Sequence, residues 1–507
     1  MREQANRNPS TGPRPHGETP EPVPTPGDTG PDPCVAKTPA PGVLGVPRPL
    51  RRPRLRTADR QQILPAMPLD QIIESDHPAR AVWRFVEGLD LSLLYDRIRA
   101  RDNAPGRTPT DPRILVALWL YAILYGVLSA RRLEELSKHH NAFRWLRGGV
   151  PLNHHLLSDF LVERVDFLKQ LFTHSVAVLL REGRVDLDRV GQDGMRVRAS
   201  AGAASFRRQA TLEKLLHQAA QKVQRLKAQV AQAAGPESSE ATPGNDVAAE
   251  NASPASEAPK PTGRQRGAQQ RAAEERLERV QHALERLPEM QAKKKPADRE
   301  QARVSTTDPE ATVMKMADGG YRPAYNIQFS STCDHQVIVG VDVVTIGSDQ
   351  GQLPPMLDQI EERFEKRPHE VLVDGGFANH EDIEAVQSGV GEKAGCKVYA
   401  PVPKPKKEGV DRHASHQGDG PEVAEWRQRM GTAAAKEIYK QRAATAECVN
   451  AQGRNRGLIR LLVRGLQKVQ AVALWFATVH NMARGFALMP PAAEAAGKPT
   501  DLVFAPI

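Results

Sequence analysis

Strand-forming segments occur on both sides of a long helical stretch, and this arrangement limits the folds open to the chain. The segment RVDLDRVGQDGMRVRAS precedes residues 205–302, and PAYNIQFSSTCDHQVIVGVDVVTIG, HEVLVDGG and GCKVYAPV follow them. Runs of this kind, rich in Val, Ile and aromatic residues and bounded by Gly, Asp and Pro, are typical of strands. We therefore expect one mixed sheet covered by helices, an α+β or α/β fold, which a helical insertion interrupts.

The interrupting stretch has the apolar spacing of paired helices. Two series of apolar residues advance by alternating steps of four and three: Leu212, Leu216, Ala219, Val223, Leu226 and Val230, then Ala273, Leu277, Val280, Leu284 and Leu287. Such heptad patterns predict two coiled-coil-like helices that fold back on each other. Residues 232–268 between them are rich in Ala, Pro, Ser, Glu and Gly, and we expect a disordered linker there.

The chain before the first strand divides into a polar arm and a helical region. Residues 1–58 are dense in Pro, Gly and charge and end in RPLRRPRLR. Such a stretch buries too little apolar surface to offset its ordering entropy, so we expect a disordered basic arm that is either solvated or binds phosphates through its arginines. Residues 59–184 carry the Pro and Asp-Pro punctuation of helix starts and predict an all-α domain.

Charge, hydropathy and cysteine usage indicate the partner and the compartment. The net charge of +9 and the pI of about 9.4 favour nucleic acid over a membrane surface. Residues 114–130 are uncharged, but their number is at the lower edge of a spanning length, so a buried core helix is the preferred interpretation. Four dispersed cysteines predict neither a disulfide framework nor a zinc site, and they fit a reducing cytoplasm.

Part of the helical region has a possible DNA-binding corner. Two short amphipathic helices joined by Gly148 and Gly149 resemble a helix-turn-helix, which would place one helix in the DNA major groove. Any helical bundle contains such corners, so the expectation of DNA contact here depends mostly on basic charge. Arg131 and Arg132 are candidate contacts within this region.

Three acidic residues stand at positions that suggest a shared site. Asp374 ends the strand HEVLVD, Asp193 lies in the strand region VGQDGMRV, and Glu447 lies on a predicted helix among small and neutral residues. Each has an ordinary explanation, because Asp-Gly is common in turns and a single Glu on a helix is usually solvated. Together they would supply carboxylate ligands for paired divalent cations, which can bind the attacking and leaving oxygens of a phosphodiester displacement.

From about Gln61 to Arg484 the chain resembles the DDE-type transposases of bacterial insertion sequences, the group with a helical N-terminal domain and an RNase H-like catalytic domain. The residues that carry the resemblance include GRTPTDPRILVALWLYAILYGVLSARRLEEL, VGQDGMRVRASA, STTDPEATVMKMADGGYRPAYNIQ, VLVDGGFANHEDIEAV and YKQRAATAE. The resemblance implies that residues 185–204 and 303–490 form an RNase H-like catalytic domain, interrupted by residues 205–302 and followed by a tail at 491–507.

The resemblance also implies roles for individual residues. In the family the first acid lies on the first sheet strand, the second just after the fourth strand and the third on a late helix. These positions correspond to Asp193, Asp374 and Glu447, which are expected to be catalytic and to hold two Mg²⁺ (or Mn²⁺) ions. The family's Tyr–Arg–Glu–Lys block is similar to Tyr439, Arg442, Glu447 and Arg454, with Arg454 where the family usually has Lys.

Helix geometry separates the residues of this block. Glu447 and Arg454 are seven apart and share a helix face, so Arg454 is expected to hold a DNA phosphate. Arg442, five residues before Glu447, points away from that face, so we assign it a looser DNA-binding or structural role. Tyr439 either stacks on a base or packs in the core. The segment ECVNAQGRNRG lacks the aromatic and aliphatic residues expected after the glutamate, which predicts weaker packing of this helix.

Some polar residues have mainly structural interpretations. Ser305 and Asp308 lie in the block STTDPEA and are predicted to cap or turn the chain entering the next strand. Asp349 is interpreted first as a turn residue and second as a neighbour of the metal ions.

The preferred functional hypothesis is a DNA transposase that binds the ends of its insertion sequence and catalyses metal-dependent strand cleavage and strand transfer. Its expected partners are double-stranded DNA, as terminal inverted repeats and target, and at least one further copy of the chain. The expected location is the bacterial cytoplasm, in association with the nucleoid and not with a membrane. The alternatives are a catalytically inactive DNA-binding protein derived from a transposase, and a nonspecific metal-dependent nuclease.

Overall fold

The computed structural model describes residues 67–98, 108–233, 262–389, 395–405 and 409–488. The arm predicted at 1–58, the tail predicted at 491–507 and most of the linker predicted at 232–268 lie outside these ranges. Every helix within the described ranges is too short or too polar to span a bilayer.

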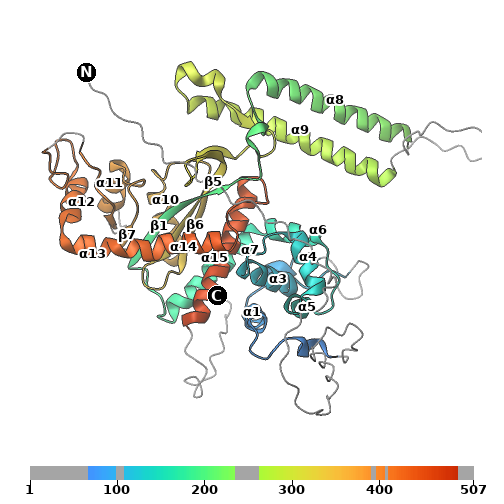
Figure 1. Cartoon of the computed structure of the whole chain (residues 1–507), viewed down its shortest axis with the longest axis horizontal. Coiled ribbons are helices and arrows are strands. Elements are labelled where there is room, and N and C mark those ends of the chain that lie inside the picture. The colour runs from blue at the N-terminus through green and yellow to red at the C-terminus, as the bar shows by residue number, and fades with distance from the viewer. Residues whose placement is uncertain (1–66, 99–107, 234–261, 390–394, 406–408, 489–507) are drawn as a thin grey trace, which may run out of the picture. The chain divides into compact units, whose positions relative to one another are not determined.

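One mixed sheet forms the centre of the fold (Figure 1). Its strands are β1 (Arg189–Arg198), β4 (Thr312–Lys315), β5 (Tyr321–Thr332), β6 (Ile338–Val344), β7 (Glu370–Leu372) and β8 (Lys397–Tyr399). The strand order is β4-β5-β1-β7-β8, with β6 also paired to β5. β5 is antiparallel to β1, β4 and β6, whereas β7 is parallel to both β1 and β8. The predicted mixed sheet is confirmed.

The chain before β1 is helical in its described parts, as predicted. Its helices are η1 (Leu69–Ile72), α1 (Pro78–Glu87), α2 (Ser92–Tyr95), α3 (Pro112–Leu124), α4 (Ala130–His139), α5 (Asn141–Arg147), α6 (His154–Val162) and α7 (Val165–Arg181). The uncharged segment of the sequence forms α3, which begins at the Asp111–Pro112 cap and is buried almost throughout. Trp119 on α3 donates its indole N–H to the carbonyl of Leu157 on α6 at 3.1 Å, so the apolar helix is part of the protein core.

Helices cover both faces of the sheet. They are α10 (Leu353–Phe364), α11 (His380–Ser388), α12 (Pro421–Gly431), α13 (Ala433–Arg442), the π-helical turn η4 (Ala443–Glu447), α14 (Cys448–Asn455) and α15 (Leu466–Leu488). α15 is buried over most of its length: Phe476 packs against Phe329 of β5, and Trp475 donates to the carbonyl of Leu161 on α6 at 3.1 Å. One continuous core therefore joins the helical region to the sheet through α15.

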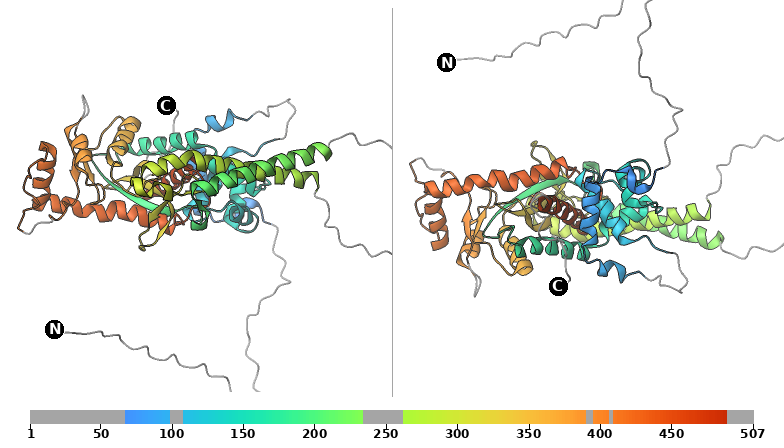
Figure 2. Two further views of the ribbon diagram at one scale, coloured as in Figure 1. Left: turned by 90° about the horizontal axis from the view of Figure 1, so that it is seen from above. Right: turned by 90° about the horizontal axis from the view of Figure 1, so that it is seen from below.

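The stretch between β1 and β4 forms two long helices that lie side by side (Figure 2). Its elements are η2 (Ala203–Ser205), β2 (Phe206–Arg207), α8 (Gln209–Ala233), α9 (Gly263–Ala292), η3 (Pro296–Gln301) and β3 (Val304–Ser305), which we call the α8–α9 insertion. The seam residues Val223 and Val280 are buried. α9 begins inside the predicted linker, because Thr262 and Gln265 form a capping box that fixes its start.

The block STTDPEA connects the insertion to the start of α15. The Ser305 hydroxyl accepts hydrogen bonds from the backbone N–H groups of the two residues before Pro309, and Asp308 accepts from the Tyr325 hydroxyl at 2.7 Å and from Gly465 N at 3.2 Å. Glu310 accepts from the backbone N–H of Leu466 at 2.6 Å. Two carboxylates thus satisfy the first N–H groups of a buried helix, which is a structural role.

Candidate active site

Parallel pairing places Asp193 and Asp374 at neighbouring positions of the sheet. In the register of β1 and β7, Gly191 pairs with Leu372, and the two acids each lie two residues further along. Both side chains are half-buried. The backbone N–H of Gly376 donates to Asp374 Oδ1 at 2.7 Å, which fixes one oxygen of that carboxylate in the turn after β7. The buried strand β7 is therefore followed by an acid, Asp374, at the position where it lies next to Asp193 of β1.

The segment α13–η4–α14 crosses the sheet at close range. A Cβ atom at Gly191 would lie 2.9 Å from Thr445 Oγ1 of η4, and one at Gly453 of α14 would lie 3.2 Å from Met195 Cε of β1. Small residues therefore let the helical segment approach the strand. The expectation of weak packing from ECVNAQGRNRG is wrong, because there is no room for large side chains on this face.

Arg442 joins the first and third acids. Its guanidinium lies 2.6 Å from Glu447 Oε1 and 3.4 Å from Asp193 Oδ1. The interpretation that Arg442 points away from Glu447 is wrong. In a regular α-helix five residues amount to a rotation of about 140°, but η4 is a π-helical turn with i→i+5 bonding, which returns Arg442 and Glu447 to one face.

The three acids act together on the same arginine. Burial lowers the pKa of Arg442, but the charges of Asp193, Asp374 and Glu447 offset this, so its pKa lies above the ordinary value. Burial raises the pKa of Asp193 to about 6, Arg442 opposes that shift, and the negative charge of Asp374 adds to it. These mutual effects place the three carboxylates in one electrostatic neighbourhood.

Two further polar residues belong to this neighbourhood. Asn450 on α14 donates from Nδ2 to Asp193 Oδ2 at 2.9 Å. Asp349 is buried beside the backbone of Gly194, where a Cβ atom would collide with it, and it accepts from the amides of Asn326 and Gln328 at 2.7 Å each. The polar run SDQGQ after a strand is a weak signal for Asp349, and no sequence pattern distinguishes Asn450.

The other predicted site residues lie at varied exposures. Arg454 is exposed on α14. Tyr439 on α13 is half-buried and packs against the core, which agrees with the packing alternative. Arg131 and Arg132 are exposed on α4 of the helical region, where Arg132 pairs with Glu135 at 2.7 Å. Arg442 thus contacts the acids, whereas Arg131 and Arg132 are exposed to solvent on α4.

The donor set has the chemistry that a hard divalent cation requires. Carboxylate oxygens are the preferred protein ligands of Mg²⁺, and Asp193, whose pKa burial raises to about 6, lies beside a second acid, Asp374. Among the described residues, however, no three His, Cys, Asp or Glu side chains come close enough together to hold one ion. Glu447 is 55% exposed and pairs with Arg442 at 2.6 Å.

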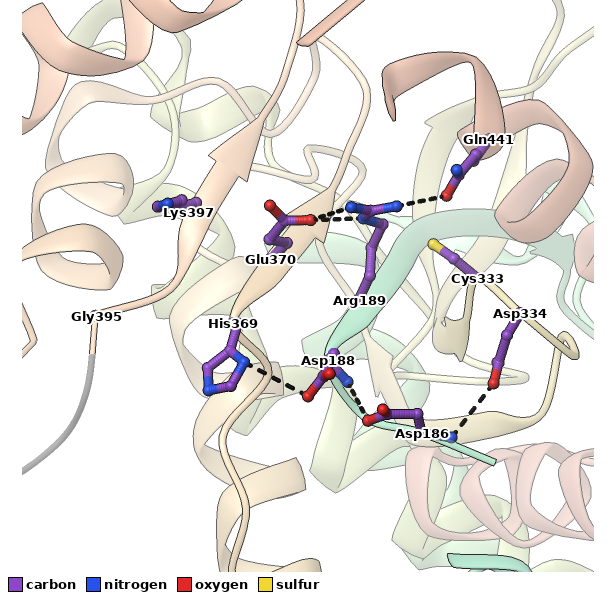
Figure 3. Close-up of a pocket in the computed structure, with 10 residues that line it drawn as sticks. All are labelled: Asp186, Asp188, Arg189, Cys333, Asp334, His369, Glu370, Gly395, Lys397 and Gln441. Atoms are coloured by element: carbon purple, nitrogen blue, oxygen red, sulfur yellow. Dashed lines mark hydrogen bonds and ion pairs between the residues drawn. The ribbon is translucent and has the colours of Figure 1, made fainter. Parts of the chain in front are cut away.

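A separate open pocket lies at the opposite ends of β1 and β7 (Figure 3). Its volume is about 930 Å³, and most of the residues that line it are charged. Arg189 contacts Glu370 at 2.6 Å and donates to Gln441 Oε1 at 3.0 Å, and Lys366 binds two aspartates of the rim. The contact between Arg189 and Gln441 ties the last turn of α13 to the start of β1.

The sheet and its carboxylates define a mixed α/β protein with an acidic centre formed by the middle of β1 and the end of its parallel neighbour β7. Two family models match the chain: a transposase domain (DUF772) over residues 67–163 and a transposase DDE domain over residues 393–486. These matches support the assignment of the chain to the DDE transposases of insertion sequences. No curated protein and no solved structure matches the chain.

Proposed function

We propose that the chain binds the ends of its own insertion sequence and catalyses metal-dependent cleavage and transfer of DNA strands. The observation that carries the proposal is that Arg442 pairs with both Asp193 and Glu447, while the charge of Asp374 acts on the same guanidinium. The acids come from a central strand, from the end of a parallel neighbour and from a crossing helical segment. This order of elements, together with the strand order, supports an RNase H-like catalytic domain.

The proposed reaction consists of two phosphoryl transfers. Water attacks a phosphodiester at the element end, and the bond to the 3′ oxygen breaks to leave a 3′-hydroxyl. That hydroxyl then attacks a phosphodiester of the target DNA and displaces its 3′ oxygen. DDE transposases generally use divalent metal ions, and such ions stabilise the attacking and leaving oxygens. Asp193, Asp374 and Glu447 would hold them, as Mg²⁺ or Mn²⁺.

The chain's own side chains prepare this site. Arg442 supplies positive charge to the carboxylates and orients two of them. Asn450 fixes Asp193 Oδ2, and the turn after β7 fixes Asp374 Oδ1. The exposed Arg454, on the same segment as Glu447, would hold a DNA phosphate next to the acids, and the exposed Arg131 and Arg132 would contact DNA at the helical region. Joining two element ends implies at least a dimer on DNA.

Purified protein with element-end duplex and Mg²⁺ tests the proposal. Wild-type protein should nick the element end, and Asp374→Asn should abolish nicking while retaining DNA binding in a gel-shift assay. Asp318→Asn, at an exposed turn between β4 and β5, is the matched control and should nick normally.

Binding to element ends without any nicking in Mg²⁺ or Mn²⁺ would contradict the catalytic proposal and favour an inactive DNA-binding derivative. Equal cutting of unrelated duplexes would favour a nonspecific nuclease. Both alternatives are thus distinguished in the same experiment.

A further inference from the structure

The turn between β5 and β6 contacts the π-helical turn directly. Gln336 in this turn donates from Nε2 to the carbonyl of Ala444 at 2.7 Å. Its Oε1 lies 3.8 Å from the Cys448 thiol, which donates to it. One glutamine side chain therefore reaches both η4 and the first residue of α14.

An outside donor matters here because a π-helical turn is less favourable than a regular helix. Its i→i+5 bonds are rare in proteins and occur mostly as single turns inside α-helices, often at functional sites. Backbone carbonyls in such an irregular stretch need partners. The bond from Gln336 stabilises a carbonyl of the π turn itself, and so favours this turn over the regular alternative.

The backbone of Gln336 is held in an unusual conformation. Its φ of 58° lies in the left-handed region, which is uncommon for residues other than glycine. Such conformations persist where the surroundings over-determine them, and they concentrate at functional sites. Polar side chains of α15 hold the backbone of this turn and of the residues after it: His480, Asn481 and Arg484.

The contacts to α15 are specific. His480 Nε2 lies 2.7 Å from the carbonyl of Gln336, and Arg484 Nε donates to the carbonyl of His335 at 2.7 Å. Asn481 bonds both backbone groups of Ile338, accepting from its N–H at 2.8 Å and donating to its carbonyl at 2.7 Å. The buried helix α15 thus fixes the turn, and the turn presents the Gln336 amide to η4.

We propose that Gln336 is a positioning residue for Glu447: it stabilises the π turn that places Glu447 against Arg442, which also pairs with Asp193. The catalytic consequence rests on the proposed function, whereas the effect on η4 does not. Arg442 and Glu447 are five positions apart, so the π turn takes up one residue more than an α-helix needs to place the two on one face. Without it, the carboxylate of Glu447 rotates away from the other acids.

Gln336→Leu removes the donor while keeping a similar volume, and His335→Ala is the matched control on the same turn, with a 41% exposed side chain. In full-length protein, Gln336→Leu should accelerate amide hydrogen exchange in residues 443–449, and His335→Ala should not. Nicking of element-end DNA should fall about tenfold, the size of effect that a small misplacement of a catalytic group produces. The Mn²⁺ concentration for half-maximal nicking should rise several-fold, which a general loss of stability would not cause.

Deletion of Ala444 provides a rescue. It leaves Arg442 and Glu447 four positions apart, the spacing that shares a face in a regular α-helix, so no π turn is needed. In that background Gln336→Leu should change nicking by less than about twofold, because there is no π turn left to stabilise. A tenfold loss that persists in the deletion background would overturn the proposal.

Amide exchange decides the proposal even where activity does not. If exchange in residues 443–449 is the same in wild type and Gln336→Leu, the proposal is wrong, whether or not the deletion variant folds. If wild-type protein never cuts DNA but exchange rises in Gln336→Leu alone, the proposed function fails and the positioning of Glu447 by Gln336 stands.

Discussion

Two helical segments of this protein differ in how their sequences specify them. The helices α8 and α9 follow a heptad seam with one exposed face, and their α-helical assignment continues through Pro288 near the end of α9. The segment α13–η4–α14 is irregular, with a π turn in its middle and close contacts to β1, to the β5–β6 turn and to Arg189. The first is stabilised by its own periodicity, whereas the second takes its shape from the groups around it.

The difference between the two segments shows how the direction of a functional side chain on a helix is determined. A regular amphipathic helix presents side chains at fixed rotations, so its face follows from spacing alone. A π turn shifts that rotation, and only a tertiary environment that supplies donors and space maintains it. Here the environment consists of a glycine on β1, a glutamine on a neighbouring turn and a hydroxyl within η4.

Neutralising Glu447 of η4 should change the nicking rate far more than neutralising a glutamate of α9, and this is the largest expected difference between the two segments. Glu447→Gln is expected to lower the rate of element-end nicking about a thousandfold, or about 4 kcal/mol in activation free energy, because a charged ligand of the proposed metal site is lost. Glu278→Gln, at an exposed position of α9, should leave the rate unchanged. Single-turnover nicking assays measure both. Equal rates for the two variants would remove Glu447 from the site.

The pH dependence of stability tests His480 of α15, which holds the β5–β6 turn that contacts η4. Burial lowers the pKa of His480 to about 4, below its ordinary value near 6.5, so the folded state favours the neutral ring. The folded state then binds fewer protons than the unfolded state between these values. Stability is therefore complete above pH 6.5 and is lost as pH falls toward 4, by about 3 kcal/mol at most.

Urea unfolding of wild type and His480→Gln at pH 4.5 and 7 checks this expectation. Glutamine keeps a donor for the carbonyl of Gln336 but does not titrate, so the loss at low pH should shrink. His282→Gln, at an exposed site on α9, should keep the wild-type dependence. A His480→Gln curve that matches wild type at both pH values would contradict the assignment.

A methyl group between β1 and η4 should destabilise the irregular segment. In Gly191→Ala the new Cβ meets the Thr445 hydroxyl at 2.9 Å and the Ala446 side chain at 3.5 Å, with the helical segment held from the other side. Overpacking of this kind costs about 2 kcal/mol in the free energy of unfolding. Urea denaturation measures it, and an unchanged midpoint would show that η4 has room to move.

The same substitution in the regular segment should act in the opposite direction. Gly267 lies within α9, and a Cβ atom there meets nothing within 4 Å. Gly267→Ala should stabilise α9 by about 1 kcal/mol, because alanine loses less backbone entropy in a helix. Amide exchange along α9 measures the effect. A loss of protection there would break the contrast between the two segments.

Sequence patterns predicted the parts of the fold that follow from regular periodicity. Alternation and turn residues located β1, β5 and β7, and an uncharged run located α3. The mixed sheet and the helical region before it followed from these patterns. Asp374 stands out because a buried strand ends on it, whereas Asp193 within a strand and Glu447 on a helix gain meaning only as its partners and through the family resemblance.

The remaining features of the site depend on contacts between distant parts of the chain. A uniform helical period predicts the wrong orientation for Arg442, because Ala443–Glu447 form a π turn in the structure. Asn450 and Gln336 have no local signature, since an amide on a helix or in a turn is usually solvated. Their roles arise only where the folded chain brings Asp193 and Ala444 to them.

The short pairing of β2 with β3 has a consequence for how such proteins diversify. Phe206 faces Ser305 and Arg207 faces Val304, so the two ends of α8–α9 leave and re-enter the body as adjacent strands, about 5 Å apart. A chain that gains, loses or exchanges everything between them needs only a tight turn to close the gap. Because its two ends are adjacent, the α8–α9 insertion can change in length or content without any change in the strand order of the sheet.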